Sequence, residues 1–258
     1  MNKLISLLAK SKNTIVFTGA GVSTLSGIRD FRGVGGFYSA NWDGMEVEDI
    51  LSLDFFMSDP TLFYRWAREF LYTLEQYTPS VVHTVLATLE QEGLIRGVYT
   101  QNIDMLHQRA GSTHVWEIHG SPAIHHCLGC GAQFFYTEIA PQVLKGEVPF
   151  CSICNGVIKP DVVFYGEQLK AKLLDQAYQD MARADLVLVL GSSLTVQPAA
   201  SLPMATFYHG GKIVIVNSQE TPLDKYAKLR FYDLKEVFSA LEIHLHNGVI
   251  SHTLQDGD

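Results

Sequence analysis

The sequence predicts an α/β fold, in which a Rossmann-like parallel sheet carries helices on both faces. Short β-branched runs alternate with longer helical patterns along the chain, and several of these runs end directly in a polar or glycine-rich segment. With 258 residues, of which 47% are hydrophobic, the chain can bury a substantial core.

The predicted elements follow this alternation. Strands are expected at residues 14–18, 97–100, 115–118, 186–190 and 213–216. Helices are expected between them, notably at residues 60–77, 80–93 and 169–183. At the carboxyl edge of an open parallel sheet, backbone N–H groups and helix N-termini can meet an anion. We therefore expect ligands to bind where these strands end.

Two segments interrupt the alternation. Residues 33–77 are aromatic and helical, and residues 122–159 contain every cysteine, after which the strands resume at Leu186. We interpret both as insertions into one discontinuous domain, which form a small lobe facing the sheet across a cleft. The predicted large domain comprises residues 1–33, 79–121 and 159–258, and the small lobe comprises residues 34–78 and 122–158.

The four cysteines form one pattern, a Cys127-x2-Cys130 pair followed by a Cys151-x2-Cys154 pair. Two such pairs supply a tetrahedral all-thiolate shell with no open position, which predicts one structural zinc ion. Two disulfides in a secreted domain are the alternative, disfavoured because no secretory signal is recognisable. The neighbouring His125 and His126 could compete as ligands, but four cysteines already fill the site.

Charge and hydropathy narrow the class of protein. The net charge of -8, without a basic stripe, argues against a protein that coats nucleic acid. An acidic surface suits basic peptides, although solubility alone also explains such a charge. No apolar run approaches the length of a membrane span. We expect a cytoplasmic protein without a membrane partner, and a monomer.

The first predicted strand leads into a glycine-rich turn, TGAGVST at residues 18–24. Such a turn lets the backbone approach a pyrophosphate, and it then opens a helix towards the charge. Thr24 replaces the third glycine of the dinucleotide fingerprint, and no clear acidic residue follows about twenty positions later. A hydride-transferring dehydrogenase is therefore disfavoured, and a purely structural turn remains an alternative.

Further motifs extend the pattern over nearly the whole chain. They are GIRDFRG (27–33), QNID (101–104), HG (119–120), the cysteine pairs, VVFYGE (162–167), GSS (191–193) and NS (217–218). In this order the set resembles the sirtuin family. Arg29 is a departure, since many members have proline there, but arginine also occurs.

The resemblance implies an NAD-dependent protein-lysine deacylase that transfers the acyl group to ADP-ribose and releases nicotinamide and free lysine. The catalytic residues would be His119, as general base towards a ribose hydroxyl, and Asn102, which would engage the ribose or an ordered water. Asp104 and the backbone near Ile28 and Ile103 would hold the carboxamide, and Phe31 would shield the reaction centre.

NAD is thus a consumed co-substrate, and the large domain binds it. The GSS turn and the strand end at Asn217 fit its adenosine half, with Tyr232, Asp233 or Leu234 as a backbone cap, although a Ser-rich turn can also be a plain helix cap. The residues expected to contact NAD are Gly19, Ala20, Gly21, Thr24, Ile28, Asp30, Phe31, Arg32, Gln101, Asn102, Ile103, Asp104, His119, Gly191, Ser192, Ser193, Asn217, Ser218, Gln219, Asp233 and Leu234.

The acyl-lysine protein or peptide is the expected partner. Val163, Phe164 and Tyr165 should wall an apolar tunnel for the lysine, and the peptide should add a strand between the lobes. Sirtuins that remove acidic acyl groups carry an arginine three residues after a helix tyrosine, and here Ala67 takes that place after Tyr64. We therefore expect an uncharged acyl group such as acetyl, although Arg65 or Arg68 could compensate if the helix register differs.

Two other functions remain as alternatives. Protein ADP-ribosylation or NAD hydrolysis shares the cleavage of the nicotinamide bond but does not need His119 as an acyl-transfer base. A non-catalytic NAD-sensing module is disfavoured because Asn102, Asp104 and His119 are all present.

Overall fold

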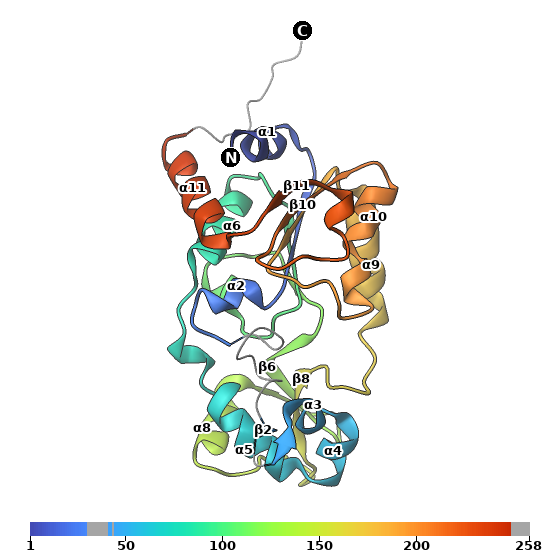
Figure 1. Ribbon diagram of the computed structural model, residues 1–258. Helices are drawn as coiled ribbons and strands as arrows, with labels where there is room; N and C mark the ends of the chain where they lie inside the picture. The colour runs from blue at the N-terminus through green and yellow to red at the C-terminus, as the bar shows by residue number, and fades with distance from the viewer. Residues whose placement is uncertain (30–40, 43, 249–258) are drawn as a thin grey trace.

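The computed structural model describes residues 1–29, 41–42 and 44–248. Its central sheet has six parallel strands in the order β11-β10-β9-β1-β4-β5. Figure 1 shows this sheet with its helices in the upper part of the molecule and a smaller lobe below. The strands are β1 (Thr14–Thr18), β4 (Gly97–Thr100), β5 (Val115–Glu117), β9 (Leu186–Leu190), β10 (Lys212–Val216) and β11 (Ala227–Phe231).

Helices cover both faces of this sheet. Along β1, Val16 packs into one core, whereas Ile15 and Phe17 pack into the core on the opposite face. The first core lies under α1 (Asn2–Lys10), α6 (Val81–Gln91) and α11 (Leu234–His246). The second lies under α9 (Ala171–Arg183) and α10 (Pro203–Tyr208). The predicted α/β fold is confirmed.

The predicted strands agree closely with the observed ones. Those at 14–18, 97–100 and 186–190 match β1, β4 and β9, while β5 ends one residue earlier than predicted and β10 begins one residue earlier. The edge strand β11 and the helices α1, α10 and α11 were not predicted. The helices expected at 80–93 and 169–183 correspond to the slightly shorter α6 and α9.

The helix predicted at residues 60–77 is wrong at its C-terminal end. Helix α5 (Pro60–Phe70) stops seven residues earlier, and a short 3-10 helix, η2 (Leu74–Gln76), follows. The N–H of Tyr72 bonds to the carbonyl of Ala67 at 2.9 Å, and the Tyr72 hydroxyl lies 2.6 Å from Nε2 of the buried His125. Burial of Tyr72 against the metal-binding segment therefore overrides the helical pattern.

The small lobe combines a three-stranded antiparallel sheet, in the order β7-β6-β8, with short helices. Its aromatic core joins the two inserted segments, since the Tyr72 ring lies 5.6 Å from Tyr136 and 5.8 Å from His125 between centroids. Its elements are β2 (Asn41–Trp42), β3 (Met45–Glu46), α3 (Val47–Ile50), α4 (Leu53–Ser58), α5, β6 (Gly120–Cys127), β7 (Gln133–Phe135), α8 (Tyr136–Leu144) and β8 (Ile158–Val162).

The predicted domain boundaries stay a prediction. Strand β6 crosses the predicted boundary between residues 121 and 122, and β8 crosses the predicted boundary between residues 158 and 159. We propose that these two strands connect the lobes.

The remaining elements are α2 (Gly21–Thr24), α7 (Leu106–Arg109), η3 (Ala199–Ser201) and η4 (Asp224–Tyr226).

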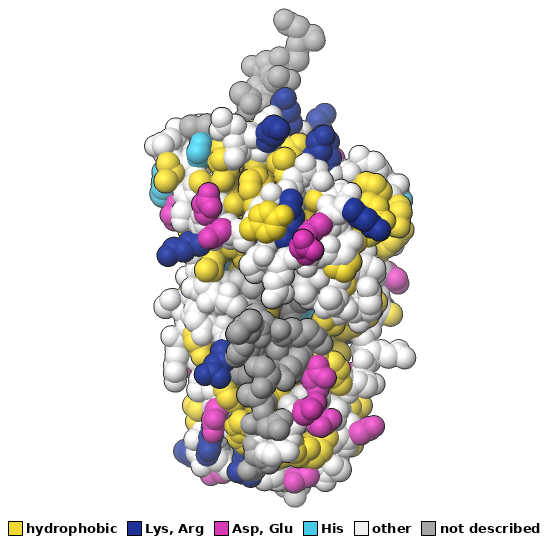
Figure 2. All heavy atoms as spheres, in the orientation of Figure 1, with side chains coloured by type: hydrophobic (Ala, Val, Ile, Leu, Met, Phe, Trp, Pro, Cys, Tyr) yellow, Lys and Arg dark blue, Asp and Glu magenta, His cyan; other side chains and the backbone are white. Residues whose placement is uncertain are grey.

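The surface carries mixed charge on the face seen in Figure 2. Lys and Arg side chains gather at the end where α1 lies, and acidic side chains lie beside the small lobe. Within the described part of the chain, no helix has the length and apolarity needed to cross a bilayer.

Candidate active site and metal centre

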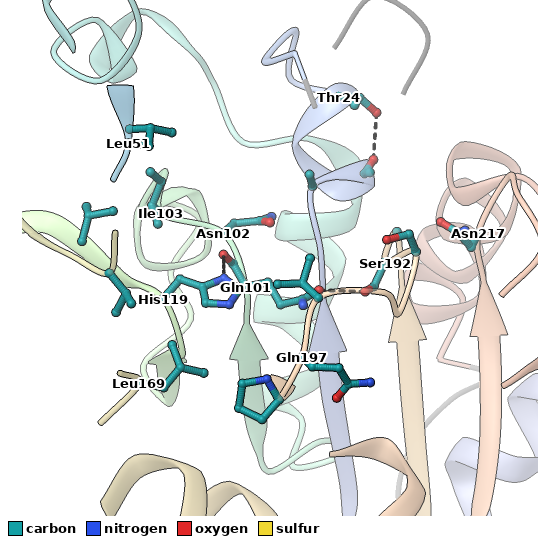
Figure 3. Close-up of a pocket in the computed structure, with 18 of the residues that line it drawn as sticks. Thr24, Leu51, Gln101, Asn102, Ile103, His119, Leu169, Ser192, Gln197 and Asn217 are labelled. Carbon is teal, nitrogen blue, oxygen red and sulfur yellow. Dashed lines mark hydrogen bonds between the residues drawn. The ribbon is translucent and has the colours of Figure 1, made fainter. Parts of the chain in front are cut away.

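A cavity of about 880 Å³ lies where the carboxyl ends of β1, β4, β9 and β10 face the segment after β8. Figure 3 shows its lining side chains, with Gln101 and His119 between the strand ends and the small lobe. The segment after β8 contributes apolar side chains, and the strand ends contribute polar ones. The cavity therefore lies at the place in the sheet that the sequence predicts.

Most of the predicted cofactor residues line this cavity. Gly19, Ile28 and Asp104 do not line it, and Asp30, Phe31 and Arg32 lie outside the described residues. The predicted residues that do line it are Ala20, Gly21, Thr24, Gln101, Asn102, Ile103, His119, Gly191, Ser192, Ser193, Asn217, Ser218, Gln219, Asp233 and Leu234.

The glycine-rich turn after β1 packs directly against the turn after β9. A Cβ atom on Gly19 would come within 2.8 Å of the Gly191 carbonyl oxygen, and one on Gly21 within 2.8 Å of the Gly191 Cα. Gly191 itself has φ of 60°. We expected these glycines to permit approach of a pyrophosphate, but the immediate reason for Gly19 and Gly21 is the approach of two protein loops.

Asn102 is held by its side-chain amide. Its Nδ2 group donates to the carbonyl of Gly19 at 3.1 Å and to Oγ of Ser23 at 2.9 Å. A carbonyl oxygen can only accept, so Nδ2 must point to Gly19. The amide oxygen of Asn102 is then the atom left for a ligand in the cavity.

Asp104 lies behind Asn102 and is 5% exposed. Its carboxylate accepts hydrogen bonds from Oγ of Ser23 and, at 2.9 Å, from the N–H of Leu106. Burial raises the pKa of Asp104, and these hydrogen bonds oppose that rise. The predicted contact of Asp104 with a carboxamide stays a prediction, as does that of Ile28, which packs against the core of the small lobe.

His119 follows β5 and reaches into the cavity. Its Nδ1 lies 2.9 Å from the backbone carbonyl oxygen of Gln101. Because that oxygen can only accept, Nδ1 carries the proton and Nε2 carries the lone pair. This is the tautomer in which Nε2 can act as a base.

The same glutamine connects His119 to the turn after β9. Oγ of Ser192 donates to Oε1 of Gln101 at 2.7 Å, and it accepts from the N–H of Leu194 at 3.2 Å. The backbone oxygen of Gln101 thus orients His119 while its side chain binds Ser192. These contacts link residues from three different strand ends.

The far end of the cavity is formed by the segments after β10 and β11. The Asn217 side chain donates to the carbonyl of Gln219 at 2.9 Å, which closes the turn after β10. The Asp233 carboxylate accepts from the N–H of Glu236 at 2.9 Å and so caps α11. The sequence pattern missed Lys235, the only Lys or Arg among the described lining residues.

Val163, Phe164 and Tyr165 wall the opposite end of the cavity, where they were predicted. The N–H of Val163 donates to the carbonyl of His119 at 2.9 Å, and Tyr165 exchanges two 2.9 Å backbone hydrogen bonds with Leu51 and Leu53. This segment is therefore tied to both the general-base candidate and the helical insert.

Other apolar lining residues were missed, because they come from loops without a recognisable motif or, for Leu174, from helix α9. They are Leu25, Leu51, Leu169, Leu174, Val196 and Pro198.

An ion pair between a buried lysine and a partly exposed glutamate lies at this wall. Nζ of Lys159 is 2.8 Å from Oε2 of Glu167 and donates to the carbonyl of Val162 at 2.8 Å. Oε2 of Glu167 also accepts from the N–H of Phe164 at 2.7 Å. Burial lowers the pKa of Lys159, and Glu167 opposes that shift.

Tyr64 and Ala67 lie away from the cavity. Tyr64 is buried and donates to the backbone carbonyl of Ile158, and Ala67 is fully buried. The guanidinium of Arg65 lies 5.5 Å from the centre of the Trp42 ring, and neither Arg65 nor Arg68 lines the cavity.

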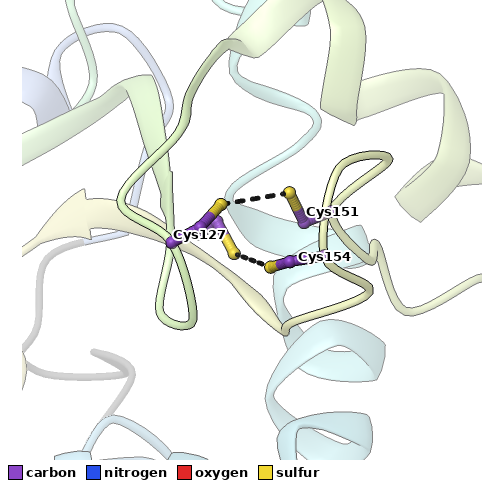
Figure 4. Close-up of side chains that lie close together, drawn as sticks. Cys127, Cys151 and Cys154 are labelled. Carbon is purple, nitrogen blue, oxygen red and sulfur yellow. Dashed lines mark hydrogen bonds between the residues drawn. The ribbon is translucent and has the colours of Figure 1, made fainter.

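The four cysteines converge in the small lobe, and Figure 4 shows their side chains together. All four sulfur atoms lie within 4.8 Å of one another, with Cys127 to Cys154 at 3.4 Å and Cys130 to Cys151 at 3.7 Å. A tetrahedral zinc site with bonds of about 2.3 Å places its sulfurs about 3.8 Å apart, whereas a disulfide bond is about 2.05 Å long. The cysteines are therefore placed to bind one metal ion, and the disulfide alternative is wrong.

The adjacent histidines are not part of this cluster. His125 is buried with its Nε2 at the Tyr72 hydroxyl, and His126 lies 3.1 Å from the side chain of Gln133. Backbone N–H groups of Gly129 and Ile153 instead point at the sulfurs of Cys127 and Cys151, at 3.3 and 3.4 Å.

Comparison with known proteins identifies the family. The model of the Sir2 family matches residues 19–198. The NAD-dependent protein deacetylase of Thermotoga maritima is 44% identical over 90% of this chain and 92% of its own length.

Solved structures agree in fold. A Sir2 complex with a p53 peptide and NAD+ superposes with a TM-score of 0.85, at 43% identity over 97% of this chain and 99% of that chain. A Sir2 variant with a deacetylated p53 peptide and 3'-O-acetyl ADP-ribose gives a TM-score of 0.87, at 42% identity over the same shares. With the motifs, the cavity and the cysteine cluster, these matches place the chain in the Sir2 family.

Proposed function

We propose that this protein is an NAD-dependent protein-lysine deacylase. In this reaction an acyl-lysine, NAD and one water give free lysine, nicotinamide and O-acyl-ADP-ribose. The protein's relatives are named as deacetylases and deacylases, and solved Sir2 structures hold NAD, an acetylated ADP-ribose and peptides.

The observation that carries the proposal is the composition of one continuous cavity. Its strand-end side is lined by backbone and small polar residues, and its small-lobe side by Val163, Phe164 and Tyr165. His119 lies between the two sides, with its Nε2 as the basic nitrogen. One side fits a dinucleotide and the other the methylene chain of lysine, so the two substrates would meet at His119.

The polar side would hold NAD, which supplies the nicotinamide–ribose bond that is broken. We propose that Ala20, Gly21 and Thr24 face the phosphates, and that Ser192 and Ser193 continue this path. Asn217, Asp233 and the segments around them would enclose the adenosine. The ribose next to nicotinamide would lie near Asn102 and Gln101.

At the reaction centre, His119 would take the proton from a ribose hydroxyl through Nε2, and the acyl group would pass to that hydroxyl. The amide oxygen of Asn102 would orient the ribose or a water. Asp104 and Ser23 would hold Asn102 from behind, because Ser23 bonds to both of them. The described residues would thus orient the substrates and accept the proton.

At the lysine end, we propose that the peptide runs along the Val163 to Tyr165 wall and that the acyl group is uncharged. No Arg lines the described cavity, so a carboxylate there would lack the bidentate partner that acidic acyl groups need. The peptide would be held mainly by backbone contacts, as in other β-addition complexes.

The cellular setting is a separate proposal. Four thiols gathered around a metal site, and not joined as disulfides, suit the reducing cytoplasm. The net charge of -8 disfavours nucleic acid as a direct partner. The monomeric state stays a prediction, which sedimentation of the purified protein would test.

The test is mass spectrometry of an acetyl-lysine peptide incubated with the zinc-loaded protein, with and without NAD. NAD-dependent loss of acetyl, matched by an equal amount of O-acetyl-ADP-ribose, is the expected result. Release of nicotinamide with the acetyl group intact would instead favour ADP-ribosyl transfer or NAD hydrolysis, and labelled protein would distinguish these two.

A further inference from the structure

Two buried histidines lie outside the cavity, behind the loop after β4 that carries Asn102. His83 comes from α6 and His107 from α7, and they are 0% and 1% exposed. Their ring centroids are 4.7 Å apart. Burial lowers the pKa of His83 to about 4 and that of His107 to about 3, so both rings are neutral near pH 7.

The tautomer of His83 follows from its contact with the start of α6. The backbone N–H of Ser80 donates to Nδ1 of His83 at 3.1 Å. A backbone N–H can only donate, so Nδ1 of His83 is the acceptor and Nε2 carries the ring proton. That Nε2–H group is buried and has no hydrogen-bond partner among the described residues.

The tautomer of His107 follows from two threonines at strand ends. Nε2 of His107 lies 3.0 Å from Oγ1 of Thr18. Thr18 gives its single hydroxyl proton to Oγ1 of Thr100 at 2.8 Å, so it must accept from His107. Nε2 of His107 therefore carries the proton, and its Nδ1 is a buried acceptor without a partner in the described part of the chain.

The two unpartnered atoms are complementary. His83 presents a buried donor and His107 a buried acceptor, on adjacent rings. A buried polar group without a partner is strongly disfavoured, and one hydrogen bond between these two atoms satisfies both.

We propose that His83 and His107 are positioning residues for the loop that carries Asn102. The link between the two rings is a hydrogen bond from His83 to His107, made directly or through one buried water. It completes a string of hydrogen bonds that runs from Ser80 through both rings to Thr18 and Thr100. In each of these hydrogen bonds the donor lies on the Ser80 side of the acceptor.

The string ends on the loop that carries Asn102. Oγ1 of Thr100 accepts from Thr18 and also from the backbone N–H of Asn102 at 3.0 Å. The neighbouring carbonyl of Gln101 orients His119. The string therefore fixes the backbone from which both proposed catalytic side chains are held, although neither buried histidine touches a substrate.

The part of this inference that concerns catalysis rests on the proposed deacylase function, but the tautomers do not. Imidazole 15N NMR of the labelled, zinc-loaded protein at pH 7 reads them directly, with His83→Gln and His107→Gln used to assign the signals. We expect neutral Nε2–H rings for both, in contrast to Nδ1–H for His119. An Nδ1–H or doubly protonated ring at either buried position would overturn the string.

A pair of variants tests the positioning role. His107→Gln keeps a donor near the place of Nε2, whereas His107→Met has none. We expect amide exchange of Asn102 to quicken about tenfold in His107→Met and to stay near the wild-type rate in His107→Gln. The exposed His114 provides the control variant His114→Gln, which should leave this exchange unchanged.

The same variants separate the inference from the proposed function. If the protein deacylates lysine, kcat should fall about tenfold in His107→Met, with KM for the peptide nearly unchanged, and should recover in His107→Gln. Equal exchange rates in the folded Met and Gln variants would overturn the positioning role whether or not the wild type is active. If His107→Met does not fold, the variant His107→Gln still tests the role. Wild-type exchange rates in His107→Gln, together with the NMR tautomers, would support it, and faster exchange in that variant would contradict it.

Discussion

Nδ1 of His119 lies 2.9 Å from the backbone carbonyl oxygen of Gln101. A backbone carbonyl cannot change its role, so this one contact fixes the tautomer of the imidazole at any pH at which the ring is neutral. The side chain of Gln101 is itself held by Ser192, at 2.7 Å. The orientation of the proposed base thus depends on the loops that line the cavity.

His119→Ala should lower kcat for deacylation by about two to four orders of magnitude, the contribution of a general base. The fold should be unaffected, because His119 lines the cavity and is only partly buried. Mass spectrometry of O-acyl-ADP-ribose measures the effect. His209→Ala, the same change at an exposed position after α10, is the control. Wild-type turnover in His119→Ala would rule out this residue as the base.

Glu167→Gln should destabilise the protein by about 3 kcal/mol, because it removes the carboxylate that pairs directly with the buried ammonium of Lys159. The peptide KM should rise, since Phe164 bonds to the same carboxylate oxygen. Thermal unfolding and peptide kinetics measure both effects. The double variant Lys159→Met with Glu167→Gln should regain much of the lost stability. Additive effects of the two single changes would show that the pair is not coupled.

Cys127→Ala should release the metal and unfold the small lobe, because zinc binding contributes about 10 to 16 kcal/mol in small zinc-binding peptides. Activity should be lost with it. Metal analysis and circular dichroism measure the change, and Ser152→Ala, within the other C-x-x-C turn at residues 151–154, is the control. A variant that keeps both its zinc and its turnover would contradict a structural role for this site.

Acid should destabilise the protein between about pH 6.5 and pH 4. Burial lowers the pKa of His83 to about 4, of His107 to about 3 and of His125 to about 4, so each stays neutral when folded and is protonated when unfolded. The unfolded state binds more protons in this range. The free energy of unfolding should therefore decrease as the pH decreases, by about 1.4 kcal/mol per pH unit for each proton.

Two buried carboxyl groups, Asp104 and Glu117, act in the opposite direction because burial raises their pKa values. Thermal unfolding at several pH values from 7 to 5 checks the net sign. The zinc content must be measured at each pH, since protonated thiols release the metal. A Tm that does not change while zinc stays bound would contradict this account.

A succinylated peptide should be deacylated at least about tenfold less efficiently than the acetylated peptide of the same sequence. Ala67 is buried, and Lys235 is the only Lys or Arg among the described lining residues, at the far end of the cavity. Competition of the two peptides in one reaction measures the ratio of kcat/KM. A preference for succinyl would show that a cation reaches the acyl group.

The sequence predicted the elements whose signal is local. Strands β1, β4 and β9 are mainly apolar and buried along their whole length, and their ends coincide with glycine or polar motifs. Strand β11 was missed because Lys228 and Arg230 alternate with its apolar residues, as suits an edge strand with one exposed side. The end of α5 was missed because a contact distant in sequence, between Tyr72 and His125, sets it.

In the site, too, local sequence signals were predicted and contacts between distant parts of the chain were not. The motifs located His119, Asn102 and the cysteines, because the chemistry needs those residue types. They could not show that Gln101 joins His119 to Ser192, or that Ser23 lies between Asn102 and Asp104, since such contacts depend on how separate strand ends meet. Nor could they show that Gly19 and Gly21 serve the contact between two loops.

Strand β6 begins at Gly120, directly after His119, and ends at the metal ligand Cys127. One hydrogen-bonded ribbon therefore has the proposed base at one end and a thiolate at the other. An agent that removes the metal or oxidises the thiols can then disturb the chemistry without entering the cleft, which makes the metal centre a remote point of vulnerability for the enzyme.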